Sequence, residues 1–174
     1  MRNLSVNGDR LWHSLMETAV IGGTPKGGIK RLTLTEEDRA VRDWLARECR
    51  VLDCAMIVDE VGNMFFMRAG SDPSLEPIAI GSHLDTQPTG GKFDGILGVL
   101  AGLEILRTLN ESCYVTRHPL MLVNWTNEEG ARFSPAMLGS GVHAGVFDRH
   151  FADTRIARDG QAFGDALEAI GYRG

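Results

Sequence analysis

Two short segments of the chain carry more polar functional groups than a protein core needs. The first is GSHLDTQPTGGKFDG at 81–95, and the second is NEEGARF at 127–133. Imidazole and carboxylate groups bind divalent cations such as zinc and manganese, and they also serve as general acids and bases. The two segments therefore predict metal-assisted hydrolysis, although each residue also has a purely structural interpretation.

His83 and Asp85 form the first candidate pair. In an extended segment, residues two positions apart point to the same side. A carboxylate beside an imidazole fixes its tautomer and raises its basicity, which is the arrangement found around metal-binding histidines. Taken alone, the pair is at least as typical of a hydrogen bond on a protein surface.

Asp94 follows a glycine-rich turn and stands at the start of a strongly apolar helical pattern. An aspartate at this place is typical of a helix N-cap, whose side chain accepts a hydrogen bond from the first turn. A carboxylate at a loop-to-helix junction can also reach a crevice at the end of a sheet and bind a metal ion. Taken alone, the residue favours the N-cap, and metal binding is the alternative.

Glu128 and Glu129 come shortly after the apolar run PLMLVNW at 119–125. Adjacent carboxylates repel each other, so a pair beside an apolar element is tolerable if a cation neutralises one and the pKa of the other rises. One glutamate as metal ligand and its neighbour as general base is a division of roles that suits hydrolysis. The alternative is a pair of solvated loop side chains.

The elements that must position these residues alternate between strands and helices. Apolar periodicity predicts helices over 8–20, from Thr35 to about Arg50, and over 94–109, 140–147 and 163–170, with a loop at 22–28. Strands are predicted at 77–80 and 119–125, and as a pair within 55–68 around a Gly62-Asn63 turn. This order predicts an α/β fold with a mostly parallel, helix-flanked sheet. Ligands bind beyond the carboxyl ends of such strands, so we expect the five candidate residues to converge there.

Length and composition exclude several other classes of protein. A chain of 174 residues corresponds to one domain, and 43% hydrophobic with 24% charged residues is ordinary globular composition. The formal net charge is 18 − 23 = −5, which disfavours nucleic acid and anionic membranes as partners. No signal-peptide or membrane-spanning apolar run is found, and three cysteines without a CxxC motif predict reduced thiols in a cytoplasmic protein.

The chain resembles the N-terminal part of the M20-type metal-dependent amidohydrolases. Within them it is similar to the branch of N-carbamoyl-L-amino-acid hydrolases, beta-ureidopropionases and allantoate amidohydrolases. The stretches that carry this resemblance are TPKGGIKRLTLTEEDR at 24–39, GSHLDTQPTGGKFDG at 81–95, LGVLAGLEILRTLNE at 97–111, NWTNEEGARFSPAMLGSGVHAG at 124–145 and FGDALEAIGYRG at 163–174. The resemblance implies hydrolysis of linear amide or ureido C–N bonds by a zinc-peptidase-like catalytic domain.

The resemblance also implies a role for each residue of the candidate site. His83 would bind one metal ion, Asp94 would bridge two ions, and Glu129 would bind the second. Asp85 would orient His83, and Glu128 would be the general base that activates the attacking water. The cofactors would be two divalent ions of zinc, manganese, cobalt or nickel.

Two further positions near the motifs, Gln87 and Arg132, are candidates for substrate contact, although the role expected first for each is that of a supporting hydrogen-bonding residue. His143 stands where the family carries an apolar or small residue, and a structural role is expected for it. A structural role is also expected for His13, His118 and His150.

The resemblance further implies parts that residues 1–174 do not contain. These are two more histidine ligands and a lid domain that grips the substrate and forms a homodimer. Residues 1–174 are thus expected to be the N-terminal part of the catalytic metal-binding domain, with an incomplete site. Two other hypotheses remain: an inactive truncated product, and a complete hydrolase with a single metal ion bound by His83, Asp94 and Glu129.

Overall fold

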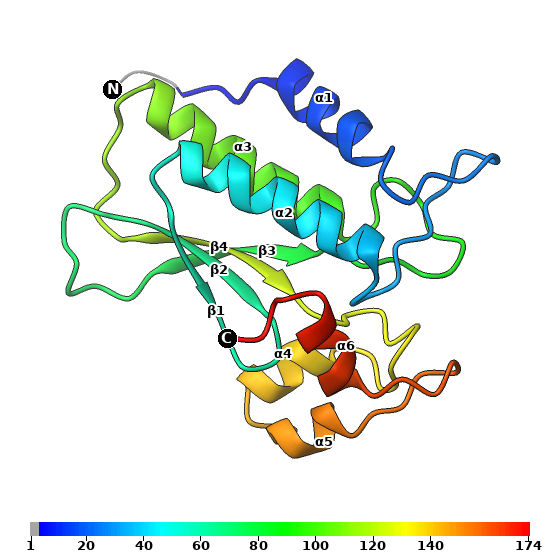
Figure 1. Ribbon diagram of the computed structural model, residues 1–174. Helices are drawn as coiled ribbons and strands as arrows, with labels where there is room; N and C mark the ends of the chain where they lie inside the picture. Colours follow the sequence, from blue (N-terminus) through cyan, green and yellow to red (C-terminus); the bar gives the residue numbers. More distant parts are fainter. Residues whose placement is uncertain (1–3) are drawn as a thin grey trace.

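A four-stranded sheet with the spatial order β1-β2-β4-β3 organises the chain (Figure 1). The computed structural model describes residues 4–174. The strands are β1 (Ala55–Val58), β2 (Met64–Arg68), β3 (Ile78–His83) and β4 (Leu120–Trp125). The helices are α1 (Gly8–Thr18), α2 (Glu36–Val51), α3 (Ile96–Glu111), α4 (Leu138–His143), α5 (Arg149–Asp153) and α6 (Phe163–Ala169). The α/β class and the two short strands around Gly62-Asn63 are confirmed.

The prediction of a mostly parallel sheet is wrong, because the sheet is mixed. β1 pairs with β2, and β2 pairs with β4, both in antiparallel register. β3 and β4 run parallel, with His83 opposite Trp125. The short turn at 59–63 closes β1 and β2 into a hairpin, whereas α3 provides the long crossover that parallel strands need. Both polar motifs lie at the carboxyl ends of this parallel pair, β3 and β4.

The helices form two groups (Figure 1). α1, α2 and α3 lie over one face, and their apolar side chains form the main core with residues of the sheet such as Met64, Phe66 and Leu122. α4, α5 and α6 gather near the C-terminus around a second core that includes Phe133 and Phe163. Within residues 4–174, no helix is both long and apolar enough to cross a membrane.

Helix boundaries agree with the sequence at α2 and differ at α4. The hydroxyl of Thr35 accepts a hydrogen bond from the Asp38 amide and caps α2, as expected from its type and position. The expected helix over 140–147 is instead the shorter α4, because the chain turns at Gly145 with a φ of 71°. The short helix α5, capped by Asp148, was not predicted.

A buried ion pair connects α2 to the turns that follow β1 and β4. The Arg42 side chain is 1% exposed and its Nε lies 2.9 Å from Asp38 Oδ2, which is fully buried. Its other nitrogens donate to the Gly62 carbonyl at 2.7 Å and to Thr126 Oγ1 at 3.1 Å. One guanidinium group therefore holds three separate segments together.

We expect Arg42→Met to lower the free energy of unfolding by about 3–5 kcal/mol, because it leaves the Asp38 carboxylate buried without its cation. Urea denaturation of the purified chain measures this loss. The double variant Asp38→Asn/Arg42→Met removes both charges and should be less destabilised than the single variant. Equal losses in both would show that the charge pairing of Asp38 contributes little.

Candidate metal centre

The two polar motifs leave the sheet at the same edge. β3 ends at His83 and β4 ends at Trp125, and these residues are partners in the parallel register. The loops that follow therefore start side by side, one leading to Asp94 and the other to Glu128 and Glu129. Their start points bring together residues that lie more than 40 positions apart in sequence.

His83, Asp94 and Glu129 come together at this edge. One ligand atom of each, an imidazole nitrogen or a carboxylate oxygen, lies within 4.8 Å of those of the other two. His83 is buried, Asp94 is exposed and Glu129 is intermediate, so the group opens to solvent on one side. Convergence of the three predicted ligands is what the sequence led us to expect.

The His83 ring is oriented by the backbone of Asp85. Its Nδ1 lies 2.9 Å from the Asp85 carbonyl oxygen, which can only accept, so Nδ1 carries a proton in this contact. The Asp85 carboxylate is farther away, with Oδ1 at 3.6 Å from Nδ1. Nε2 faces the glutamates and lies 3.2 Å from Glu128 Oε2. This tautomer leaves Nε2 as the atom suited to bind a metal.

The Asp85 carboxylate instead joins the two loops. It is buried, and its two oxygens accept hydrogen bonds from the backbone amides of Glu128 and Glu129, each at 3.3 Å. Sequence reasoning placed Asp85 beside His83 but missed this link to the second motif. The local sequence around Asp85 does not indicate which amides its carboxylate will contact, because those amides lie on another loop.

Glu129 has one satisfied and one unsatisfied oxygen. Its Oε2 accepts a hydrogen bond from Gln87 Nε2 at 2.6 Å. Its Oε1 is buried and has no hydrogen-bond partner among the described residues. A buried carboxylate oxygen without a donor is costly unless a cation compensates it. The donor set of one imidazole and two carboxylates, together with this orphaned oxygen, therefore fits a divalent cation.

Asp94 does not cap α3. The N-cap of α3 is Gly95, with a φ of 68°, and no side chain of the described residues forms a cap hydrogen bond there. The Asp94 backbone carbonyl accepts from the Ile96 amide at 2.7 Å, and its carboxylate stays free of the helix. The N-cap interpretation of this residue is therefore not what the structure shows.

Burial and neighbouring charges shift the pKa values of two groups in the site. Burial disfavours the charged form of His83, but Asp85 and Glu128 outweigh this effect and raise its pKa to about 9. Burial raises the pKa of Glu128, and the carboxylates of Glu129, Asp85 and Asp94 raise it further, against the opposing effect of His83. A raised pKa makes Glu128 better suited to accept a proton near neutral pH.

The raised pKa of His83 predicts a pH dependence of stability in chelator-treated protein. Its folded value of about 9 exceeds the unfolded value of 6.5, so protonation of His83 stabilises the fold fully below pH 6.5. This contribution is lost as the pH rises from 6.5 through 9. We expect the urea midpoint in EDTA to fall over this range, and the fall to be smaller in His83→Gln. Parallel profiles for the two proteins would contradict this assignment.

Gly95 packs directly under the His83 ring. A Cβ atom at Gly95 would overlap with three atoms of the imidazole, and the φ of 68° also disfavours a larger residue. We expect Gly95→Ala to displace the His83 ring and weaken zinc binding by about 10- to 100-fold, a range typical when ligand orientation is lost. Gly91→Ala is the matched control, because a Cβ there meets no atom within 4 Å. Chelator competition measures both, and equal affinities would show that ring placement does not depend on Gly95.

The remaining candidates lie around this group. Gln87 is exposed and hydrogen-bonded to Glu129, at the rim of the site. Arg132 donates through Nη1 to the Thr33 and Leu34 carbonyls at 3.0 and 2.6 Å, and through Nη2 to Gln161 at 2.6 Å. Arg132 therefore connects loops, and few of its N–H groups remain free to donate to a substrate.

His143 is outside the three-residue group. Its ring lies 5.3 Å from the Phe65 ring and 5.2 Å from the Trp125 ring, between centroids. His13, His118 and His150 are also absent from the His83–Asp94–Glu129 group found among residues 4–174. The structural role expected for His143 agrees with its aromatic packing.

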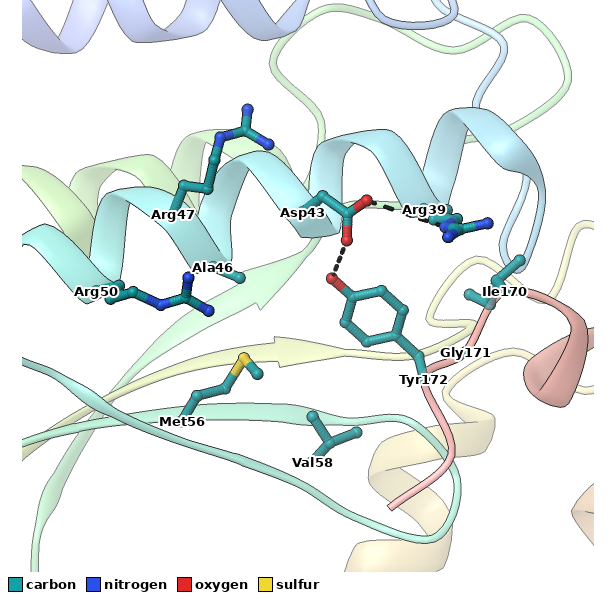
Figure 2. Close-up of a pocket in the computed structure, with 10 residues that line it drawn as sticks. All are labelled: Arg39, Asp43, Ala46, Arg47, Arg50, Met56, Val58, Ile170, Gly171 and Tyr172. Atoms are coloured by element: carbon teal, nitrogen blue, oxygen red, sulfur yellow. Dashed lines mark hydrogen bonds and ion pairs between the residues drawn. The ribbon is translucent and has the colours of Figure 1, made fainter.

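A separate hollow of about 460 Å³ lies between α2, β1 and the C-terminal residues (Figure 2). The Tyr172 hydroxyl donates to Asp43 Oδ1 at 2.7 Å across one side of it. Arg39, Arg47 and Arg50 of α2 lie along another side. None of the predicted site residues lines this hollow, and those that form the candidate metal group lie at the sheet edge instead.

Comparison with known proteins identifies the family. The family model described as Peptidase family M20/M25/M40 matches residues 79–166, which include every candidate ligand. The chain belongs to this M20 family. Its relatives place it in the hydantoinase/carbamoylase amidase branch, where the match covers their N-terminal part.

Three of these relatives show the extent of the match. An N-carbamoyl-L-amino-acid amidohydrolase of Rhizobium meliloti is 54% identical over 172 residues, covering 99% of this chain and 41% of that protein. A ureidoglycolate hydrolase of Arabidopsis thaliana is 31% identical, covering 98% and 36%. A hydantoinase/carbamoylase family amidase from Burkholderia ambifaria superposes with a TM-score of 0.97 at 53% identity, covering 99% and 43%. The chain thus spans about two fifths of their length.

Proposed function

We propose that this chain supplies metal ligands and the general base for hydrolysis of linear amide or ureido C–N bonds. The observation that carries the proposal is the convergence of His83, Asp94 and Glu129 within 4.8 Å, with Glu128 beside His83. The names of the relatives, N-carbamoyl-L-amino-acid amidohydrolase and ureidoglycolate hydrolase, support a small carbamoyl or ureido substrate.

In this proposal, His83 and Glu129 would each contribute a ligand to one of two divalent ions, and Asp94 would contribute ligand atoms to both. The buried Oε1 of Glu129 and the free carboxylate of Asp94 support these roles. When bound, the ions supply Lewis acidity to the scissile carbonyl and offset the charge of the carboxylates. Zinc, manganese, cobalt and nickel all suit an imidazole and carboxylate donor set.

Glu128 moves the protons of the reaction. Its carboxylate takes a proton from the attacking water as the new C–O bond forms at the carbonyl carbon. The same proton then passes to the leaving nitrogen as the C–N bond breaks, which returns Glu128 to its starting state. Asp85 supports this role because it holds the backbone amides of Glu128 and Glu129 in place. Gln87, at the rim, is placed to contact a polar group of the substrate.

The alternative is a chain that has no catalytic role of its own. One observation favours it: among residues 4–174, the metal-binding group contains three residues, while the resemblance implies two further histidine ligands. Fewer ligands lower metal affinity and leave coordination positions open to solvent. The activity of the whole relatives is therefore a proposal for this chain, not a property assigned to it.

Metal content and turnover of the purified chain decide between these alternatives. The chain is loaded with zinc, manganese or cobalt, its bound metal is quantified, and release of amino acid from an N-carbamoyl-L-amino acid is followed. Stoichiometric metal with turnover supports the hydrolase and rules out the inactive chain. Absence of both metal and turnover supports the inactive chain.

A further inference from the structure

Arg31 is completely buried, yet it forms no ion pair with a carboxylate among the described residues. Its Nε donates to the Leu84 carbonyl at 2.8 Å. Its Nη1 donates to the carbonyls of Thr18 and Ile21, at 3.2 and 3.0 Å, where α1 ends. Its Nη2 is buried and has no hydrogen-bond partner within residues 4–174. In the part of the chain that the structure describes, the guanidinium group is therefore held by carbonyl oxygens alone.

Burial of such a group is expensive, because a cation leaves water without a counter-ion in contact. Burial lowers the pKa of Arg31, and the negative charges of Asp38 and Asp85 oppose that effect. An apolar side chain of similar length would fill the same volume without this cost. The presence of a cation at this place is therefore explained by the groups to which its nitrogens donate hydrogen bonds, and not by packing.

The backbone around Arg31 holds the same loop. The Arg31 amide donates to Thr86 Oγ1 at 2.9 Å, and the Thr86 amide donates to the Arg31 carbonyl at 2.8 Å. Ile29 and Gly90 exchange two further hydrogen bonds, each at 2.9 Å. Residues 29–31 therefore form a strap that is hydrogen-bonded to the segment 84–90 at Leu84, Thr86 and Gly90. Both Asp85 and Gln87 lie within the segment that the strap holds.

We propose that Arg31 is a positioning residue of the metal centre. Its Nε fixes the Leu84 carbonyl, which belongs to the peptide unit between Leu84 and Asp85. Because that unit is planar, fixing its oxygen also fixes the direction in which the chain enters Asp85. The Asp85 carbonyl orients the His83 ring, and the Asp85 carboxylate holds the amides of Glu128 and Glu129. This inference rests on the proposed metal site.

The test compares three variants of the full chain. Arg31→Met removes the charge and the donors at similar length, and Arg31→Lys keeps the charge but loses the fork that reaches three carbonyls. Arg107→Met is the matched control, because Arg107 is also largely buried and connects Ser14 and Glu48 without touching the loop at 84–90. The readouts are zinc affinity by chelator competition and amide hydrogen exchange of residues 84–90 in metal-free protein.

We expect Arg31→Met to weaken zinc binding by about 10- to 100-fold and to speed exchange across 84–90. Arg31→Lys should fall between Arg31→Met and the original chain in both readouts. Arg107→Met should change zinc affinity and the exchange of residues 84–90 by no more than about 3-fold, although this variant also lowers the stability of the chain. If Arg31→Met does not fold, Arg31→Lys alone carries the comparison.

Two results would overturn the inference: zinc affinity in the Arg31 variants equal to that of Arg107→Met, or unchanged exchange across 84–90. Failure of the proposed metal site looks different, because the original chain would then bind no zinc. Exchange across 84–90 is measured without metal, so it still decides whether Arg31 holds the loop in that case. The two failures are therefore separable.

Discussion

Glu128→Gln is expected to slow hydrolysis of an N-carbamoyl-L-amino acid by about 10²- to 10⁴-fold while metal binding is retained. Glutamine has the same shape as glutamate, but its amide cannot take a proton from the attacking water. Glu128 stands beside His83, with its Oε2 3.2 Å from Nε2, and it is not one of the three clustered ligands. Turnover should thus fall with little change in bound metal.

The measurement pairs steady-state rates with metal quantification on the same preparation. Glu76→Gln makes the same chemical change at an exposed position away from the site, and its rate should match that of the original chain. Loss of metal in Glu128→Gln would make Glu128 a ligand. An undiminished rate would remove it from the reaction.

Asp94→Ala is expected to weaken zinc binding by at least about 100-fold and to leave the stability of the metal-free chain nearly unchanged. The first effect follows from the place of its carboxylate within 4.8 Å of ligand atoms of His83 and Glu129. The second follows because the carboxylate forms no cap on α3. A capping aspartate would instead cost about 0.5–2 kcal/mol on replacement.

Urea denaturation in EDTA and chelator competition together separate the two roles of Asp94. A large loss of stability with unchanged zinc affinity would restore the N-cap interpretation and remove Asp94 from the site. Asp165→Ala, on the first turn of α6, is a useful comparison because it removes an exposed carboxylate outside the metal group. Its zinc affinity should equal that of the original chain.

Much of the site was predictable because it depends on local chemistry and on the order of elements. His83 and Glu129 follow apolar strands, and strands joined by a helical crossover end at the same edge of a sheet. That rule is sufficient to predict, from the sequence alone, that the two motifs lie close together. It held here even though the sheet as a whole is mixed, since it needs only the β3–β4 pair to be parallel.

Other features could not be predicted because they depend on contacts between distant segments. The sequence offered two roles for Asp94, and the free carboxylate beside the Gly95 turn distinguishes them. The sequence placed Asp85 next to His83, but its carboxylate meets amides more than 40 residues away. Nothing in the local sequence marked Arg31, because its partners belong to α1 and to the loop after β3.

By itself, the amino-acid sequence predicted the α/β character of this protein and indicated the candidate ligands and the class of chemistry that we propose for them. Residue types and the periodicity of apolar side chains are local properties, so they can be read along the chain. The tertiary structure alone decided the strand directions, the acceptor that orients His83 and the buried cation behind the loop at 84–90. Those features are set by which groups meet when distant segments pack, because a buried donor or acceptor finds its partner in three dimensions and not along the chain.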